Sequence, residues 1–135
     1  MNKISYLIVS EILFIVFPIF ILAITHYSKG DFNLIISDYS WSFGSIVLFG
    51  QAIVKYISGL VRCEEKIVWQ KAALIISLLI LIGLIPSTIL LTAFLFLPHS
   101  WVGLGVIQLI YFLSGCIVYY ILSGTAEVLS KKKKV

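Results

Sequence analysis

Charged residues are scarce in this chain. They make up only 12% of its 135 residues, whereas a soluble domain carries roughly 25%. Apolar residues account for 61%, and the mean hydropathy is strongly positive. Most of the surface must therefore face a medium other than water, and a lipid bilayer is the obvious one. At about 20 residues per crossing, four crossings with their connections consume the chain and leave no length for a soluble domain.

Motifs for catalysis, metal binding or nucleotide binding are also lacking. The two cysteines, Cys63 and Cys116, have no metal-ligand spacing. Cys63 falls in a predicted loop and Cys116 in a predicted helix, so a disulfide between them is not expected. His26 and His99 lie at the edges of predicted spans and are interpreted as interfacial residues. We therefore predict that the protein is not an enzyme and has no catalytic residue, cofactor or metal site.

Hydropathy instead predicts an all-α polytopic membrane protein with four transmembrane helices. The predicted spans cover about residues 6–25, 41–61, 69–97 and 101–123, followed by a basic tail over 124–135. The first apolar stretch is long for a signal peptide and lacks a small-x-small cleavage pattern, so we interpret it as a retained helix. Pro18 is expected to kink the first span and Pro86 to break or bend the third, and the hydroxyls of Ser87 and Thr88 can serve the carbonyl that Pro86 frees.

The connections between the spans predict how neighbouring helices are joined. Only Pro98, His99 and Ser100 separate the third and fourth spans, which are therefore expected to form a tight antiparallel hairpin. The segment between the first two spans is partly apolar and is expected to lie against the headgroups. At its end, Asp38 or Ser40 is expected to cap the second helix by accepting hydrogen bonds from free backbone N–H groups.

Basic residues lie almost entirely on one side of the predicted bilayer. Of the ten Lys and Arg residues, eight fall on the side of the termini, one on the other side, and one inside a span. The eight are Lys3, Arg62, Lys66, Lys71, Lys131, Lys132, Lys133 and Lys134, against Lys29 alone. The positive-inside rule then predicts that both termini and residues 63–66 are cytoplasmic, with 27–40 and 98–100 outside. The overall plan points to a bacterial inner membrane.

Two opposite charges, Glu11 and Lys55, fall inside predicted spans. Glu11 is eight residues from Lys3, and Lys55 is seven from Arg62, which places both roughly 10–12 Å inside the cytoplasmic boundary. Matched depth on consecutive antiparallel helices predicts an intramembrane ion pair that locks the two helices together. Two alternatives remain open: a proton or substrate site, and a Lys55 side chain that snorkels to the headgroups.

The second span is the least apolar and carries a polar face. Gln51, Lys55, Ser58 and Arg62 recur at spacings of four, three and four, which places them on one side of a helix. Gly44 and Ser45 allow close approach of another helix, and Gln108 in the fourth span is a weaker version of the same feature. We expect a central helix, packed within its own bundle or against a second copy. Polar contact between helices is favoured over a conduction path.

The lysine cluster, Lys131 to Lys134, predicts the partners outside the bundle. A basic cluster beside a span is typical of binding to anionic headgroups, whereas a nucleic-acid face would need a scattered excess of charge. Direct binding to nucleic acid is not expected. Docking of an acidic cytoplasmic protein on the tail is the second possibility.

The arrangement of four short spans with a glutamate in the first is similar to that of small multidrug-resistance transporters. In that family the glutamate binds protons and cations, and Glu11 stands at the matching position. The chain departs from the family in its strong charge bias and in Lys55, which would neutralise Glu11. In size and plan the chain also resembles membrane subunits of bacterial antiphage systems, such as the four-span component of Kiwa.

These observations favour a non-enzymatic membrane subunit that forms homo-oligomers and anchors or recruits a partner complex, with antiphage defence as one setting. A small cation or drug transporter that uses Glu11 is the first alternative. A pore-forming or holin-like effector, with the polar face of the second span lining a path, is the second. What Glu11 and Gln51 face distinguishes the three.

Overall fold

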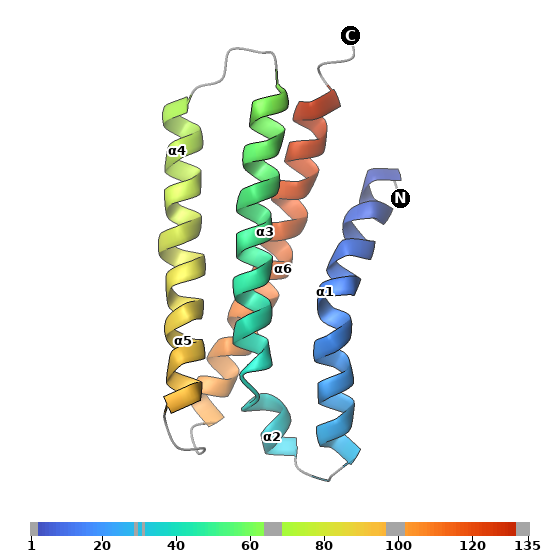
Figure 1. The fold of residues 1–135 in the computed structure, drawn as a ribbon, viewed down its shortest axis with the longest axis vertical. Helices are drawn as coiled ribbons and strands as arrows, with labels where there is room; N and C mark the ends of the chain where they lie inside the picture. Colours follow the sequence, from blue (N-terminus) through green and yellow to red (C-terminus); the bar gives the residue numbers. More distant parts are fainter. Residues whose placement is uncertain (1–2, 29, 31, 64–68, 97–101, 132–135) are drawn as a thin grey trace.

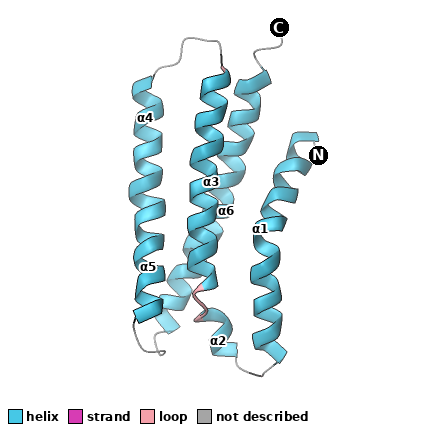
Figure 2. Cartoon of the chain, viewed as in Figure 1, coloured by secondary structure: helices cyan, strands magenta, loops and turns pink. Residues whose placement is uncertain are grey.

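A computed structural model describes residues 3–28, 30, 32–63, 69–96 and 102–131. Within these ranges the chain is helical except for a few turn residues and the short loop before the second span, and none of these residues forms a strand (Figure 2). Four helical stretches are long and apolar enough to cross a membrane: Tyr6–Ser28, Ser40–Arg62, Trp69–Phe96 and Gly103–Lys131. The expected all-α architecture with four spans is confirmed, and the chain is a multi-pass membrane protein.

The helices end close to the predicted boundaries, with one exception. They are α1 (Lys3–Ser28), α2 (Phe32–Ile36), α3 (Ser40–Arg62), α4 (Trp69–Leu78), the π-helix η1 (Leu79–Leu84), α5 (Ile85–Phe96) and α6 (Val102–Lys131). The exception is α6, which makes residues 124–131 of the expected tail helical. Hydropathy marks the end of an apolar stretch, whereas a helix satisfies its own backbone and can continue into water.

The α3 helix lies at the centre of the bundle (Figure 1). α6 runs behind it, α4 and α5 lie on one side, and α1 lies on the other. α3 is the least apolar span and also the most buried, with 44% of its apolar window buried against 11% for α1. In the core, Leu48 and Ala52 of α3 meet Phe112 and Tyr119 of α6. Because lipid accepts apolar side chains as readily as protein does, polar and small residues gather at the centre.

Small residues let α3 approach its neighbours closely. Gly59 lies against α6, where an added Cβ would come within 2.6 Å of the Cα of Ala126. Gly44 lies against α1 and α6, where an added Cβ would meet the side chains of Ile19 at 2.5 Å and Phe112 at 2.8 Å. A side chain at Gly59 would overlap the backbone of α6 and force the two helices apart, whereas at Gly44 the side chains of Ile19 and Phe112 would have to shift.

The third span passes Pro86 as one continuous helix, in which a π-helical turn replaces the expected bend. Proline cannot donate a backbone hydrogen bond, and its ring crowds the preceding turn, which the wider turn of η1 accommodates. Ser87 Oγ donates to the carbonyl of Gly83 at 2.7 Å, and Thr88 Oγ1 donates to the carbonyl of Leu84 at 2.8 Å. Each hydroxyl therefore serves the carbonyl four residues before it, and not the carbonyl that Pro86 leaves without an N–H donor, which was the expected partner. The ring of Phe49 from α3 packs on Gly83, where an added Cβ would lie 2.4 Å from it.

The helix ends divide between two ends of the bundle (Figure 1). The beginning of α1, the end of α3, the beginning of α4 and the end of α6 lie at one end, here called the terminal end. The α2 helix lies at the opposite end, as four successive crossings require. The expected hairpin link at 98–100, the loop residues 64–66 and Lys132, Lys133 and Lys134 lie outside the described residues.

Candidate functional site

A charge pair joins α1 to α3 inside the membrane-spanning part of the bundle. The ammonium group of Lys55 donates a hydrogen bond to Oε2 of Glu11, and the two side chains form an ion pair. About one third of each side chain is exposed, 29% for Lys55 and 34% for Glu11. The positive charge of Lys55 and the negative charge of Glu11 therefore compensate one another inside the membrane, where an isolated charge would be costly.

A third residue, Tyr119 of α6, completes this cluster. Its hydroxyl donates to the same Oε2 of Glu11 at 2.6 Å, and its ring centroid lies 5.4 Å from Nζ of Lys55. Tyr119 is only 2% exposed. The sequence offered little sign of this role, because a tyrosine near the end of a span normally reads as an interfacial anchor. The Glu11 carboxylate is thus held by a cation and a hydroxyl from two different helices.

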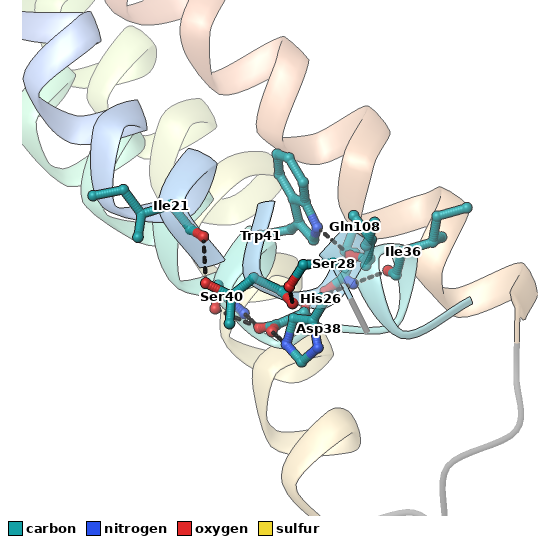
Figure 3. Close-up of polar contacts among 10 residues, drawn as sticks. Ile21, His26, Ser28, Ile36, Asp38, Ser40, Trp41 and Gln108 are labelled. Atoms are coloured by element: carbon teal, nitrogen blue, oxygen red, sulfur yellow. Dashed lines mark hydrogen bonds and ion pairs between the residues drawn. The ribbon is translucent and has the colours of Figure 1, made fainter. Parts of the chain in front are cut away.

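A second polar cluster, near the α2 end, is organised by Gln108 of α6 (Figure 3). This side chain is fully buried, and its Oε1 accepts a hydrogen bond from Ser42 Oγ at 2.9 Å. Its Nε2 donates to the carbonyls of Ile36 at 2.6 Å and Asp38 at 2.9 Å. Gln108 therefore ties the junction between α2 and α3 to α6, and its carboxamide is satisfied inside the protomer.

Asp38 links the same junction to α1. One carboxylate oxygen accepts the backbone N–H of Ser40, the first residue of α3, at 2.8 Å and also the Ser40 hydroxyl. Of the two residues expected to cap α3, Asp38 is therefore the one that accepts a backbone N–H, although the N-cap position itself is Tyr39. The other oxygen lies 2.9 Å from Nε2 of His26 (Figure 3). Trp41 adds a further tie by donating from Nε1 to the carbonyl of Ile35 at 2.7 Å. These contacts of Asp38 and Trp41 tie α1 and α2 to the beginning of α3.

The other predicted interface residues divide between the inside and the outside of the protomer. Gly44 and Ser45 are buried within the bundle, and the Ser45 hydroxyl donates to the carbonyl of Trp41 at 2.9 Å. Of the two expected arrangements, packing within the bundle or against a second copy, these two residues show the first. Ser58 is exposed and donates to its own helix at 2.8 Å. Gln51 is exposed and makes no hydrogen bond within the described ranges.

Two hollows flank the contact between α3 and α6. The first, here called the α3–α6 pocket, has a volume of about 220 Å³ at the terminal end, and its lining is half polar. The second is a groove of about 490 Å³ between the third span and α6. Its lining is almost entirely apolar and includes Ile82 and Val118. Of the two linings, that of the α3–α6 pocket contains charged side chains, namely Lys55, Arg62 and Glu127, which can recognise a charged ligand.

Neither the arrangement of possible metal ligands nor the comparison with known proteins identifies a function. Among the described residues, no group of three or more His, Cys, Asp or Glu side chains is placed to hold a metal ion. No protein-family model, curated protein or solved structure matches the chain.

Proposed function

We propose that this protein is a non-enzymatic subunit of a membrane assembly and that it associates through the exposed face of α3. One observation carries the proposal. Gln51 is the middle residue of α3, about 16 Å from either end at about 1.5 Å per residue. Its carboxamide is exposed there and has no hydrogen-bond partner in the described part of the protomer.

An unpaired carboxamide at the centre of a bilayer is costly. Neither lipid chains nor water can satisfy its donors and acceptor, and leaving them unpaired costs about 1–3 kcal/mol on mutational scales. A neighbouring helix that supplies a hydrogen bond would remove this cost. Gln51 therefore marks the surface where another membrane helix belongs.

The backbone beside Gln51 is open to such a neighbour. An added Cβ at Gly50 would meet no other atom within 4 Å, so this glycine is not used for packing inside the protomer. Val54, one turn along the same face, is 59% exposed. Small residues next to a polar one are the features that bring membrane helices together.

A second copy of the chain is the occupant that fits best. A carboxamide both donates and accepts, so Gln51 can bond to its symmetry mate across a two-fold axis. This moves the proposed interface from Gly44 and Ser45, which are inside the protomer, to Gly50, Gln51 and Val54. Cytoplasmic termini, the bacterial inner membrane, the recruited partner and the antiphage setting rest on the charge bias and plan of the sequence.

The transporter alternative has less support from the geometry. A carboxylate that carries protons or cations must release and rebind its ligands, whereas Glu11 is held by both Lys55 and Tyr119. The pair serves better as a lock between helices.

The test is the particle mass of the full chain in mild detergent and in nanodiscs. We expect an oligomer for the wild type and a shift toward monomer for Gln51→Leu combined with Gly50→Leu. One membrane hydrogen bond is worth only about 0.6 kcal/mol on average, so Gln51→Leu alone should weaken association without abolishing it. Thr88→Val, at an exposed site on α5, is the matched control and should leave the mass unchanged. A wild type that is monomeric at micromolar concentration in both media contradicts the proposal.

A further inference from the structure

The α3–α6 pocket lies at the terminal end of the bundle, where α3 and α6 run side by side (Figure 1). Its floor is closed by the contact of Gly59 with Ala126. One wall carries Arg62, the last residue of α3, and the other carries Glu127 of α6. The lining therefore presents opposite charges on two walls above a closed floor.

Ser123 gives the pocket an unsatisfied donor. Its side chain is 1% exposed, it lines the pocket, and its Oγ has no hydrogen-bond partner among the described residues. Two further hydroxyls in the lining already donate to their own helices, Ser58 to Val54 at 2.8 Å and Ser130 to Glu127 at 2.9 Å. Their oxygen lone pairs remain available to accept hydrogen bonds. A ligand that uses all of these groups must accept a hydrogen bond from Ser123 and donate hydrogen bonds to Ser58 and Ser130.

The charged side chains on the two walls, Arg62 and Glu127, do not form an ion pair with one another in the described structure, although both line the pocket and are exposed. Lys55, deeper in the lining, is already paired with Glu11. A guanidinium is suited to a phosphate group because it can donate two parallel hydrogen bonds. The carboxylate opposite it is suited to an ammonium group.

The position of the pocket indicates where its ligand comes from. Arg62 ends the second span, and Ser58 lies about 6 Å further in at about 1.5 Å per residue. The mouth of the pocket at Arg62 therefore lies at the depth of the lipid headgroups, while its inner end at Lys55 reaches into the membrane.

We propose that the α3–α6 pocket binds the headgroup of a zwitterionic phospholipid with a primary ammonium, that is, phosphatidylethanolamine. Arg62 and Ser123 hold its phosphate, and Glu127 holds its ammonium. An anionic headgroup such as that of phosphatidylglycerol satisfies Arg62 but leaves Glu127 facing a like charge or an uncharged hydroxyl. A methylated ammonium, as in phosphatidylcholine, cannot donate a hydrogen bond to Glu127.

The test is native mass spectrometry of the delipidated full chain in detergent, titrated with each of these three lipids and separately with soluble phosphoethanolamine. The wild type should bind phosphatidylethanolamine more tightly than phosphatidylglycerol or phosphatidylcholine, by about threefold for an exposed charge contact. Arg62→Gln should weaken binding of all three lipids by about tenfold, because a charge-assisted hydrogen bond is lost. Glu127→Gln should remove only the preference for phosphatidylethanolamine.

Lys71→Gln is the matched control, because it removes an exposed cation at the same end of the bundle but outside the pocket. It should change none of the affinities. Ser123→Ala tests the buried hydroxyl separately and should weaken binding of every lipid while leaving their order unchanged. Equal affinity of the wild type for all three lipids, or unchanged preference in Glu127→Gln, overturns the proposal. So does soluble phosphoethanolamine that binds as tightly as the lipid, because the ligand would then be a free phosphate ester.

Discussion

One carboxylate oxygen of Glu11 receives hydrogen bonds from two residues on two other helices. Lys55 contributes a positive charge and Tyr119 contributes a neutral hydroxyl. A pair of charges in a bilayer is stable only when each charge is neutralised and its remaining hydrogen-bonding capacity is used. The hydroxyl of Tyr119 supplies part of that capacity and ties α6 into the contact between α1 and α3.

The side chains of Glu11, Lys55 and Tyr119 are expected to be energetically coupled. Glu11→Gln and Lys55→Met should each destabilise the protein by about 1–3 kcal/mol, less than for fully buried pairs because both side chains are about one-third exposed. The double variant should recover much of the loss, since neither charge is then left alone. Tyr119→Phe should cost about 1 kcal/mol, and less when Glu11 is already glutamine. Thermal unfolding in detergent measures all of these values.

Tyr111→Phe is the control for the hydroxyl, because Tyr111 also lies on α6 but outside the charge cluster. It should be close to neutral. Strictly additive losses for Glu11 and Lys55 would mean that the two side chains do not stabilise one another in the membrane.

At the scale of helices, α3 combines low hydropathy with deep burial. Its glycines at 44 and 59 bring α1 and α6 close, while its glycine at 50 faces outward. In lipid, association depends on close packing and on polar contacts, so the helix with the most small and polar residues becomes the centre. The same helix then carries both the internal contacts and the proposed external one.

Two glycines of α3 and α6 are expected to respond differently to replacement by alanine. Gly59→Ala should destabilise by about 1–3 kcal/mol, because its Cβ would overlap the backbone of Ala126 and force α3 and α6 apart. Gly124→Ala, where an added Cβ meets nothing within 4 Å, should be neutral or stabilising by up to about 1 kcal/mol. The difference between the two melting temperatures is the measurement. Equal effects of both changes would show that α3 and α6 are not in contact at Gly59.

At the scale of the whole molecule, the four spans bring the beginning of α1 and the end of α6 to the same end of the bundle (Figure 1). The orientation of this end in the membrane is determined by the distribution of basic residues and not by helix packing. Within the described ranges, the basic residues Lys3, Arg62, Lys71 and Lys131 lie at this end.

The prediction here is that the terminal end is cytoplasmic. Single cysteines at Ser28 and Ser130, in a chain whose native cysteines are replaced by serine, should react differently with a membrane-impermeant thiol reagent in intact cells. Ser28→Cys should be labelled from outside, and Ser130→Cys only after the membrane is opened. Labelling of both from outside would refute the topology.

Much of this architecture could be predicted from local properties of the sequence. Apolar runs near the length of a bilayer crossing marked the four spans, because hydropathy depends only on neighbouring residues. Equal depth placed Glu11 and Lys55 opposite one another, since helix rise converts residue number into distance. Asp38 and Ser40 were both recognisable as candidate caps from their position at the start of α3, and Asp38 accepts a backbone N–H there. Each of these inferences needs only one helix, or two consecutive ones.

The tertiary structure decided what depends on distant segments. Both sides of α3 carry small and polar residues, so periodicity alone did not indicate that Gly44 and Ser45 turn inward while Gln51 turns outward. That choice depends on which neighbouring surfaces fit, here Ile19, Phe112 and Ala126 against the two glycines that face inward. The roles of Tyr119 and Gln108 likewise arise from partners far away in the chain. A hydrogen bond across a bundle is set by the packing of whole helices, and no local pattern records it.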